Sequence, residues 1–433
     1  MGTRPVFMPS QSAILDISLA PEGERKIEWV SLHAHTLNSL RRSHLEDGSL
    51  RGRRVAMAIH LEAKTAYLAW LLHEAGAEVA VAGSNALSTQ DDVAAALARR
   101  GLRVYASHGA NQAELDRQLL QTLDLEPDLV IDDGCELVSR LHQRRPQLLP
   151  KVRGASEETT SGILRLRAMQ AEGVLKLPVI AANQALCKHL FDNRYGTGQS
   201  TLTALMSATN LLIAGKSIVV VGYGWCGRGL ALYARGLGAR VTVVEVDPIK
   251  ALEALTDGYT VASLSEAASI GDIFITATGS VHVIRREHLE LMKNGAILVN
   301  AGNFANEIDV PALTQLAAEQ REARRHITEY VLRDGRRLYL LVQGALANIA
   351  ASDGHPIEIM DMSFSVQALA VHFLANHARE LTPGLHPLPE EIDREIASTR
   401  LRLLGVQLEE MTGEQKAYLQ SWQSNDLLPA RMN

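Results

Sequence analysis

The sequence predicts an α/β protein with two doubly wound, Rossmann-like domains followed by a helical C-terminal tail. Short apolar, β-branched runs alternate with longer helical patterns, which is typical of parallel sheets with crossover helices, and the runs form two separate series. The 433 residues exceed what one ordinary domain needs. A hydrophobic fraction of 46% and a charged fraction of 21% indicate a globular protein with an extensive core.

The two series of predicted strands define the expected domains. The first series comprises residues 54–60, 78–83, 103–109, 129–134 and 179–183. The second comprises residues 217–222, 240–247, 272–279, 296–302 and 338–344. Glycine-bearing connectors at 193–200 and 352–358 are the expected crossings between the domains. We therefore expect one domain from 1–193 with 354–390, a second from 194–353, and a tail from 391–433.

Charge and cysteine usage exclude several classes of partner. The formal net charge of −6 gives no general attraction to nucleic acid or to anionic membranes. The three cysteines, Cys135, Cys187 and Cys226, show no metal-ligand or disulfide pattern, so no metal is predicted and a reducing compartment is favoured. Without a recognisable leader or an uninterrupted apolar span, we expect a cytoplasmic protein.

A glycine-rich turn at the start of the second series predicts a dinucleotide site. Gly222, Gly224 and Gly227 follow an apolar strand and open a helix, which is the context that a pyrophosphate-binding turn requires. Glu245 ends the next strand, where a carboxylate accepts both ribose hydroxyls and favours NAD, although Lys250 nearby weakens that argument. The alternatives are a glycine-rich turn that binds nothing, or a nucleotide with a structural role.

Several long motifs extend from this turn across residues 22–420. They read SNALSTQDD (84–92), IDDGCEL (131–137), GASEETTSGILRL (154–166), FDNRYG (191–196), IAGKSIVVVGYGWCGRG (213–229), EVDPIKALEA (245–254), GNFANEID (302–309) and DGHP (353–356). With these motifs the chain resembles the S-adenosylhomocysteine hydrolase family. The resemblance implies that bound NAD oxidises the 3′-hydroxyl of a nucleoside, the 5′ substituent is eliminated, water adds, and the ketone is reduced again.

The resemblance also assigns catalytic positions. Lys188 and Asp192 handle the 3′-hydroxyl and the 4′ proton, with the pKa of Lys188 lowered by burial, and Glu158 holds the 2′-hydroxyl. Asp133 and His60 serve the 5′ end. Each residue also has an ordinary alternative, since the two aspartates can be N-caps or turn residues and Glu158 fits a capping pattern.

Further positions follow from the same resemblance. The implied cofactor-binding residues are Thr159, Thr160, Ser161, Asn193, Gly222, Gly224, Trp225, Cys226, Gly227, Glu245, Lys250, Thr278, Gly279, Asn348 and His355. The implied substrate-binding residues are Glu62, Lys64, Asn183, Asn303, Asp353, His355 and Met360, with Asn183 supporting the catalytic lysine.

The sequence departs from the family pattern where the substrate is recognised. Glu62 and Lys64 replace a Thr and a Glu or Gln that contact the adenine edge, and an ammonium cannot accept from an exocyclic amine. Glu62 either takes over that contact or is neutralised by Lys64. Asn303 replaces a His beside the 5′ carbon, and Asp353 replaces a Met of the base pocket.

Two more departures lie near the cofactor. Thr197 replaces a Cys, with Gly198 and Gln199 after it. Leu428 and Met432 replace a tail Lys and Tyr that reach a neighbouring subunit's NAD in the family.

Three functions fit these observations. The first is hydrolysis of a nucleoside thioether such as S-adenosylhomocysteine, with altered selectivity. The second is the same redox and elimination cycle on another 5′-substituted nucleoside, or with a nucleophile other than water, as in nucleoside natural-product biosynthesis. The third is a non-catalytic, NAD-bound regulatory protein, which the retained Lys188, Asp192, Asp133 and Glu158 argue against. The expected partners are a small nucleoside and further copies of the chain, as a dimer or tetramer.

Overall fold

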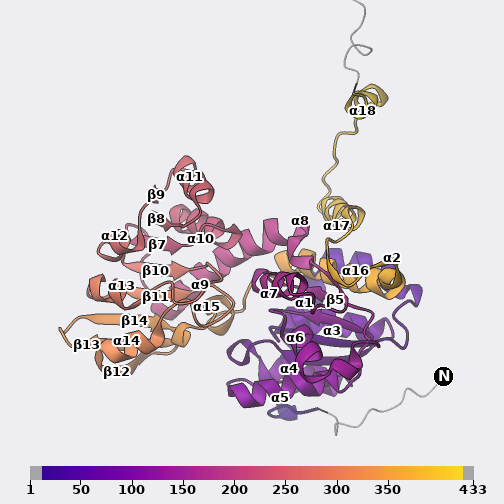
Figure 1. Cartoon of the computed structure of the whole chain (residues 1–433), viewed down its shortest axis with the longest axis horizontal. Helices are drawn as coiled ribbons and strands as arrows, with labels where there is room; N and C mark the ends of the chain where they lie inside the picture. The colour runs from indigo at the N-terminus through magenta and orange to yellow at the C-terminus, as the bar shows by residue number, and fades with distance from the viewer. Residues whose placement is uncertain (1–11, 423–433) are drawn as a thin grey trace, which may run out of the picture.

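A computed structural model describes residues 12–422, and it contains two lobes that lie side by side (Figure 1). The first lobe holds a seven-stranded sheet in the order β15-β6-β5-β4-β1-β2-β3, in which every pair of neighbours is parallel. Its strands are β1 (Arg54–Ile59), β2 (Glu78–Gly83), β3 (Arg103–Tyr105), β4 (Leu129–Asp132), β5 (Gly154–Glu157), β6 (Pro178–Ile180) and β15 (Gly384–His386).

The sequence predicted five of these strands, each to within a few residues at its ends, and missed β5 and β15. The strand β5 has the sequence GASE, and all four of its residues are buried. Small and charged residues give no apolar run, so only the sheet reveals that this segment is a strand. The strand β15 has three residues, which is too short for a periodic signal.

The second lobe holds an eight-stranded sheet in the order β12-β13-β14-β11-β10-β7-β8-β9. Its strands are β7 (Ser217–Val221), β8 (Arg240–Val244), β9 (Thr260–Val261), β10 (Ile273–Thr276), β11 (Ile297–Asn300), β12 (Ala317–Arg324), β13 (Ile327–Leu332) and β14 (Arg337–Leu341). The five predicted strands are present. The sequence missed β9 and the antiparallel pair β12–β13, in which β12 is an exposed edge strand with the polar sequence AAEQREAR.

Helices cover both faces of each sheet. In the first lobe they are α1 (Ala20–His33), α2 (His35–His44), α3 (Ala63–Glu74), α4 (Asp91–Arg99), α5 (Gln112–Leu123), α6 (Glu136–Arg144), α7 (Thr160–Ala171) and α16 (Ile357–His377). In the second they are α9 (Thr197–Thr209), α10 (Trp225–Gly236), α11 (Pro248–Thr256), α12 (Leu264–Ala268), α13 (Arg286–Leu291), α14 (Val310–Leu316) and α15 (Ala347–Ala350).

The first crossing between the lobes, which the sequence led us to expect at the glycine-bearing connector 193–200, is helical. The short helix α8 (Leu186–Lys188) runs into a π-helix, η7 (His189–Gly196), and then into α9. The glycines permit close packing: a Cβ on Gly198 would lie 2.7 Å from the Gly229 carbonyl oxygen, and one on Gly196 would lie 2.7 Å from His355 Nδ1. The return crossing is an irregular segment, residues 351–356, that leads into α16.

The helix α16 forms part of the core of the first lobe. Phe364, Val366 and Val371 are at most 2% exposed. The segment 357–380 is long and apolar enough to span a membrane, but 72% of its most apolar window is buried inside the protein. Its apolar composition is therefore explained by its place in the core.

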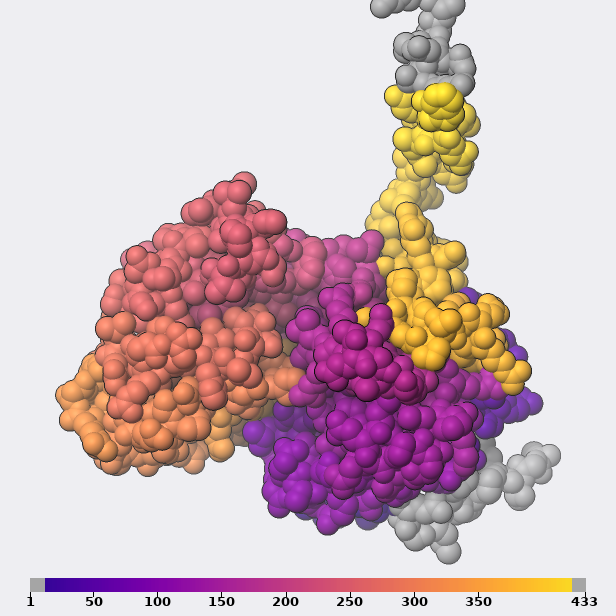
Figure 2. Space-filling model, viewed as in Figure 1, coloured from indigo at the N-terminus to yellow at the C-terminus, as the bar shows by residue number. Residues whose placement is uncertain are grey.

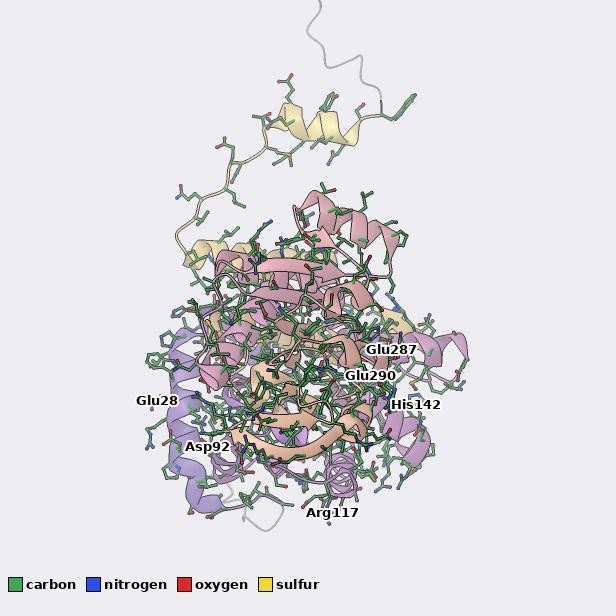
Figure 3. The ribbon with its side chains drawn as sticks, turned by 90° about the vertical axis from the view of Figure 1, so that its left-hand side faces the viewer. Glu28, Asp92, Arg117, His142, Glu287 and Glu290 are labelled. Carbon is green, nitrogen blue, oxygen red and sulfur yellow. The ribbon has the colours of Figure 1, made fainter. Side chains whose placement is uncertain are left out.

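The C-terminal segment consists of two different parts. The helix α17 (Glu390–Leu403) packs on the first lobe and buries Ile396 completely. The following residues, 404–422, are all exposed and include α18 (Gly413–Gln420). This second part forms an arm that stands clear of both lobes in two views at right angles (Figures 1 and 3) and as a projection in the space-filling view (Figure 2). Leu428 and Met432 lie outside the described residues.

Candidate active site

Lys188 lies at the centre of a buried group of polar side chains at the first crossing. Its Nζ is 3.2 Å from Glu158 Oε1 and 3.1 Å from Asp192 Oδ1, and it donates to Asn193 Oδ1 at 2.8 Å. Each of the four residues is at most 7% exposed. We call these four residues the lysine cluster. The structure thus brings together the three residues that the sequence predicted to act on the ribose and Asn193, which it assigned to the cofactor.

The two carboxylates set the protonation of this cluster. Burial lowers the pKa of Lys188, but Asp192 and Glu158 outweigh burial and raise it above the ordinary value. The predicted lowering of the lysine pKa was therefore wrong, because burial acted together with two partner charges. Burial also raises the pKa of Glu158, to about 7 despite the favourable charge of Lys188. For Asp192 the effect of Lys188 and His355 exceeds that of burial, and its pKa is lowered.

Three side chains near or on α16 hold these carboxylates. His355 Nδ1 is 3.1 Å from Asp192 Oδ1, and the Ser363 hydroxyl donates to Asp192 Oδ2 at 2.8 Å. Gln367 Nε2 donates to Glu158 Oε2 at 2.5 Å. The sequence analysis missed Ser363 and Gln367. Their spacing of one helical turn, as polar residues in an apolar helix, was the signal that pointed to a shared face.

Asn183 contacts the cluster differently from the prediction. Its amide donates to the Glu158 carbonyl at 2.8 Å, and its Oδ1 accepts from Thr160 Oγ1 at 3.0 Å. The amide that accepts from Lys188 belongs to Asn193. Asn183 thus supports the backbone of Glu158 and not the lysine itself.

Asp133 and His60 meet where they follow the neighbouring strands β4 and β1. His60 Nε2 is 3.4 Å from Asp133 Oδ2, and His60 Nδ1 is 2.6 Å from Ser88 Oγ. The Ser84 hydroxyl donates to Asp133 Oδ2 at 2.9 Å. The N-cap role considered for Asp133 is filled by Asp132, whose carboxylate accepts from the backbone at the start of α6.

Asn303 reaches this pair from the second lobe. Its Oδ1 is 3.2 Å from His60 Nε2, and its Nδ2 donates to Ser161 Oγ at 3.3 Å. Phe304, the next residue, lies under the Arg165 guanidinium, 4.4 Å from its carbon to the ring centroid. The loop at 302–305 therefore closes the site between the lobes.

Glu62 and Lys64 line a neighbouring cavity of about 520 Å3, together with Asp353, His355 and Gln199. Lys64 Nζ is 2.7 Å from Glu62 Oε2 and donates to the Asp353 carbonyl at 2.7 Å. We call Glu62, Lys64 and this carbonyl the Glu62–Lys64 edge. Met360, a predicted substrate residue, packs in the apolar core, and the residues found around the cavity do not include it.

The glycine turn of the second lobe has the shape that a pyrophosphate needs. Gly222 has a φ of 101°, and a Cβ on Gly227 would lie 1.9 Å from the Gly222 carbonyl oxygen. Gly224 faces open space, so a phosphate can approach its backbone. Glu245 follows β8 and accepts from the Tyr223 amide at 2.7 Å, which ties the turn to the next strand.

Three further predicted cofactor positions are Trp225 and Cys226, which begin α10 directly after the turn, and Lys250 in the first turn of α11. Trp225 begins α10 with its ring centroid 5.0 Å from that of His189. Cys226 Sγ accepts from Thr197 Oγ1 at 3.6 Å, and Thr197 Oγ1 is also 3.3 Å from His355 Nε2. Lys250 Nζ is 3.5 Å from Asp247 Oδ2, beside the turn and not in it.

A buried carboxylate that the sequence analysis missed organises the loop after β10. Glu307 accepts from the amides of Thr278 and Gly279, at 2.9 and 2.8 Å, and from the Thr278 hydroxyl at 2.7 Å. Burial raises its pKa. Its place inside the motif at 302–309 was the available signal.

The side-chain amide of Asn348 has only one of its two polar atoms hydrogen-bonded within the described residues. Its Nδ2 donates to Ser200 Oγ at 3.1 Å, while its buried Oδ1 has no partner among the described residues. A carboxamide of the bound cofactor is a donor of the kind this oxygen lacks. With the open glycine turn, this orphaned oxygen shows that the residues present fit NAD.

Comparison with known proteins agrees with this geometry. Residues 193–354 match the model for the NAD-binding domain of S-adenosyl-L-homocysteine hydrolase, and residues 11–147 match the S-adenosyl-L-homocysteine hydrolase model. An adenosylhomocysteinase of Pyrococcus abyssi is 55% identical over 414 residues, which cover 96% of this chain and 98% of that protein. The chain belongs to the S-adenosyl-L-homocysteine hydrolase family.

Relatives that are named for two different substrates are about equally similar to this chain. An S-inosyl-L-homocysteine hydrolase of Methanocaldococcus jannaschii is 53% identical over 409 residues, covering 94% of this chain and 98% of that protein. An adenosylhomocysteinase of Aquifex aeolicus is 51% identical over 411 residues, covering 95% and 98%. Family membership makes this chain an NAD-dependent hydrolase. The overall sequence identity therefore does not distinguish adenine from hypoxanthine as the base of the substrate.

Within the family, the departures noted in the sequence collect at two places in the structure. Glu62, Lys64 and Asp353 form the Glu62–Lys64 edge, and Asn303 contacts His60 where an imidazole was expected. The lysine cluster contains none of these departures. The residues predicted to act on the ribose and those predicted to contact the base therefore form separate groups in the structure.

Proposed function

We propose that the chain hydrolyses an S-nucleosyl-L-homocysteine to the nucleoside and homocysteine. When bound, NAD supplies the oxidation and the later reduction at the 3′ carbon. The observation that carries the proposal is the lysine cluster, in which one buried ammonium faces two buried carboxylates at the junction with the NAD-binding lobe. Buried charges of this kind are costly unless they have a function or a full set of partners.

The protonation states suggest how the ribose proton moves. Lys188 is held as the ammonium, so it must pass a proton to Glu158 Oε1 as it accepts one from the 3′-hydroxyl. A Glu158 pKa of about 7 makes this carboxylate a suitable base near neutral pH. Asp192 is ionised before the reaction and orients the ammonium. We assign removal of the 4′ proton to the Lys188–Asp192 pair, in which the Asp192 carboxylate accepts the proton and returns it when the 4′ C–H bond forms again.

The 5′ end is assigned to His60 and Asp133. Their contact at 3.4 Å supports this assignment, since the leaving sulfur needs a proton and the incoming water must lose one. The His60 Nδ1 contact with Ser88 at 2.6 Å fixes the orientation of the ring. His60 therefore delivers the proton to sulfur and recovers one from the incoming water.

A panel of nucleosides tests this proposal without depending on the leaving group. We expect enzyme-bound NADH absorbance to appear on mixing the holoenzyme with S-inosyl-L-homocysteine, S-adenosyl-L-homocysteine, inosine or adenosine, and homocysteine to be released from the thioethers. Bound NADH without homocysteine release would favour another 5′ substituent or nucleophile. The absence of bound NADH with every nucleoside would favour a non-catalytic NAD-bound protein.

The Glu62–Lys64 edge favours a 6-oxopurine over adenine as the base. Glu62 already accepts from Lys64 Nζ and from the amides of Lys64 and Thr65. Lys64 Nζ uses two of its three N–H donors on Glu62 and on the Asp353 carbonyl, which leaves one for the base. An ammonium pairs with the O6 oxygen of hypoxanthine and repels the amino group of adenine.

We therefore propose that S-inosyl-L-homocysteine is the better substrate and that S-adenosyl-L-homocysteine is turned over slowly. A hydrogen-bonding mismatch of this type costs about 1–3 kcal/mol, or about 5–150-fold in kcat/KM. Measuring kcat/KM for both thioethers tests the preference directly. An equal or higher kcat/KM for S-adenosyl-L-homocysteine would contradict the proposed preference and would make this thioether the substrate.

We also propose that the chain forms homo-oligomers, as dimers or tetramers, in the cytoplasm. The exposed arm supports association because Leu408, Tyr418 and Leu419 are 67%, 54% and 69% exposed, and such an apolar surface favours burial against another copy. The three free cysteines are compatible with a reducing compartment. Light scattering of the full chain and of a chain ending at residue 404 measures what the arm contributes.

A further inference from the structure

A carboxylate from the far end of the chain holds the backbone immediately before Lys188. The Leu186 amide donates to Asp393 Oδ2 at 2.5 Å, and the Cys187 amide donates to Asp393 Oδ1 at 2.9 Å. The Cys187 thiol donates to the Asp393 carbonyl at 3.2 Å. Asp393 lies in the first turn of α17, so these three contacts join α17 directly to the segment that carries the catalytic lysine.

Asp393 is committed to these amides. Asp393 is only 9% exposed. No Lys, Arg or His within residues 12–422 forms an ion pair with its carboxylate. A buried polar group is stabilised by its hydrogen bonds, and bonds from backbone amides to a carboxylate are short and directional. Both of its oxygens are used, one for each amide.

The segment around Lys188 needs an external support. The helix α8 has three residues and continues into the π-helix η7, so regular α-helical hydrogen bonding does not fix its position. In contrast, α17 is firmly seated on the first lobe. Ile396 is completely buried, and Arg400 NH1 is 3.4 Å from Asp361 Oδ2. Asp393 therefore anchors the short, irregular helix α8 to the well-packed helix α17.

We propose that Asp393 is a positioning residue for catalysis, which sets the backbone of Leu186 and Cys187 so that Lys188 Nζ meets both Asp192 and Glu158. This inference rests on the proposed function, since it concerns the same lysine. Proton transfer among these three groups depends on contacts of 3.1 and 3.2 Å, and a displacement of about 1 Å at a catalytic group lowers rates by about 100-fold.

The test compares three variants of the full-length holoenzyme. Asp393→Ala removes both acceptors, and Asp393→Asn keeps one oxygen that can accept a single amide. Glu395→Gln is the matched control, because Glu395 lies on the same helix and forms a surface contact with His44 at 2.8 Å. Each variant is assayed for thermal stability, NAD content, kcat, KM, and the pH dependence of bound-NADH formation with S-inosyl-L-homocysteine and S-adenosyl-L-homocysteine.

We expect Asp393→Ala to lower the rate of bound-NADH formation by about 10–100-fold, with KM changed less than about threefold. Asp393→Asn should retain more activity than the alanine variant. In both variants the midpoint of the pH dependence of bound-NADH formation should differ from that of the wild type. Glu395→Gln should match the wild type in kcat and midpoint. A support that matters only for folding would lower the melting temperature while leaving kcat and the pH midpoint of the folded protein unchanged.

The inference is overturned if Asp393→Asn keeps the wild-type kcat and pH midpoint, or if Glu395→Gln loses as much activity. If the alanine variant does not fold, the asparagine variant decides by the same measurements. If the wild-type holoenzyme forms no bound NADH with either thioether, the proposed function fails. In that case the distance from Lys188 Nζ to Asp192 in crystals of Asp393→Asn decides the positioning role, which a wild-type distance would refute.

Discussion

The lysine cluster and the Glu62–Lys64 edge use the same types of residue for different tasks. In the lysine cluster one ammonium faces two carboxylates, and the carboxylates are held by Gln367 and Ser363. In the Glu62–Lys64 edge one ammonium faces one carboxylate and a backbone carbonyl. The first arrangement has one carboxylate more than it has ammonium groups and can relay a proton, whereas the second is balanced and presents a fixed donor. The number of partners, and not the residue type, therefore distinguishes the group that we assign to the ribose chemistry from the group that we assign to the base.

The largest effect is expected when the lysine of the lysine cluster is removed, which tests the role assigned to that cluster. We expect Lys188→Ala to lower the rate of bound-NADH formation by at least about 1,000-fold, because the variant lacks the group that contacts both carboxylates. NAD content should stay close to that of the wild type, since Lys188 contacts the ribose side of the site. Absorbance of bound NADH and quantification of released NAD measure the two effects. Wild-type oxidation in this variant would refute the assignment.

The second experiment changes base recognition and leaves ribose chemistry intact. Lys64→Gln should shift the ratio of kcat/KM for S-inosyl-L-homocysteine over S-adenosyl-L-homocysteine toward adenine by about 10–100-fold, because the amide can accept from an exocyclic amine. Glutamine is preferred to glutamate here because a second carboxylate would lie beside buried Glu62. Bound-NADH formation at saturating substrate should change little. An unchanged ratio would show that Lys64 does not face the 6-substituent.

The third experiment separates both groups from the cofactor. Glu245→Ala should weaken NAD binding by about 1–3 kcal/mol, the cost of losing charged hydrogen bonds to the cofactor ribose. Because Glu245 also ties down the Tyr223 amide, the variant loses order in the glycine turn. Calorimetric titration of the apoenzyme measures the affinity. The two thioethers should be affected equally, and an unchanged affinity would contradict the role given to Glu245.

The fourth experiment tests the protonation state of the cluster. Glu158 releases its proton as pH rises through about 7, and only the ionised form can take a proton from Lys188. The kcat/KM of the wild type should therefore rise about tenfold per pH unit below this midpoint and level off above it. Glu158→Gln should be slow and should lack this limb. A limb that persists in the variant would belong to another group.

The smallest effect is expected at the loop between the lobes. Asn303→His should raise homocysteine release by about two- to tenfold, because it returns a second titratable group beside His60. Bound-NADH formation should not change, which separates the 5′ end from the ribose. Single-turnover measurement of both signals gives the comparison. A change in NADH formation alone would show that the loop acts through closure of the lobes.

Most strands could be predicted from the sequence because the patterns that indicate them are local. The strands at 54–60, 78–83 and 217–222 are apolar runs, and the glycine turn after Val221 is set by neighbours in the chain. The strands that it missed are β5, with small and charged residues, the short β9 and β15, and the antiparallel pair β12–β13, in which β12 is a polar edge strand. The strands β5, β9 and β15 lie beside partners that are distant in sequence, and such a partner leaves no periodic pattern.

The sequence by itself determined which residue types were available: Lys188, Asp192, Glu158 and Asn193 within their motifs, and an unusual Glu62 and Lys64. Only the tertiary structure decided what these residues became. It gave Lys188 a raised pKa, since two carboxylates that lie apart in the chain converge on one ammonium, and it joined Glu62 to Lys64 as a closed pair. It also brought Asp393 to the backbone before Lys188. Charge interactions depend on distance in space and on burial, and neither is written in the order of residues along the chain.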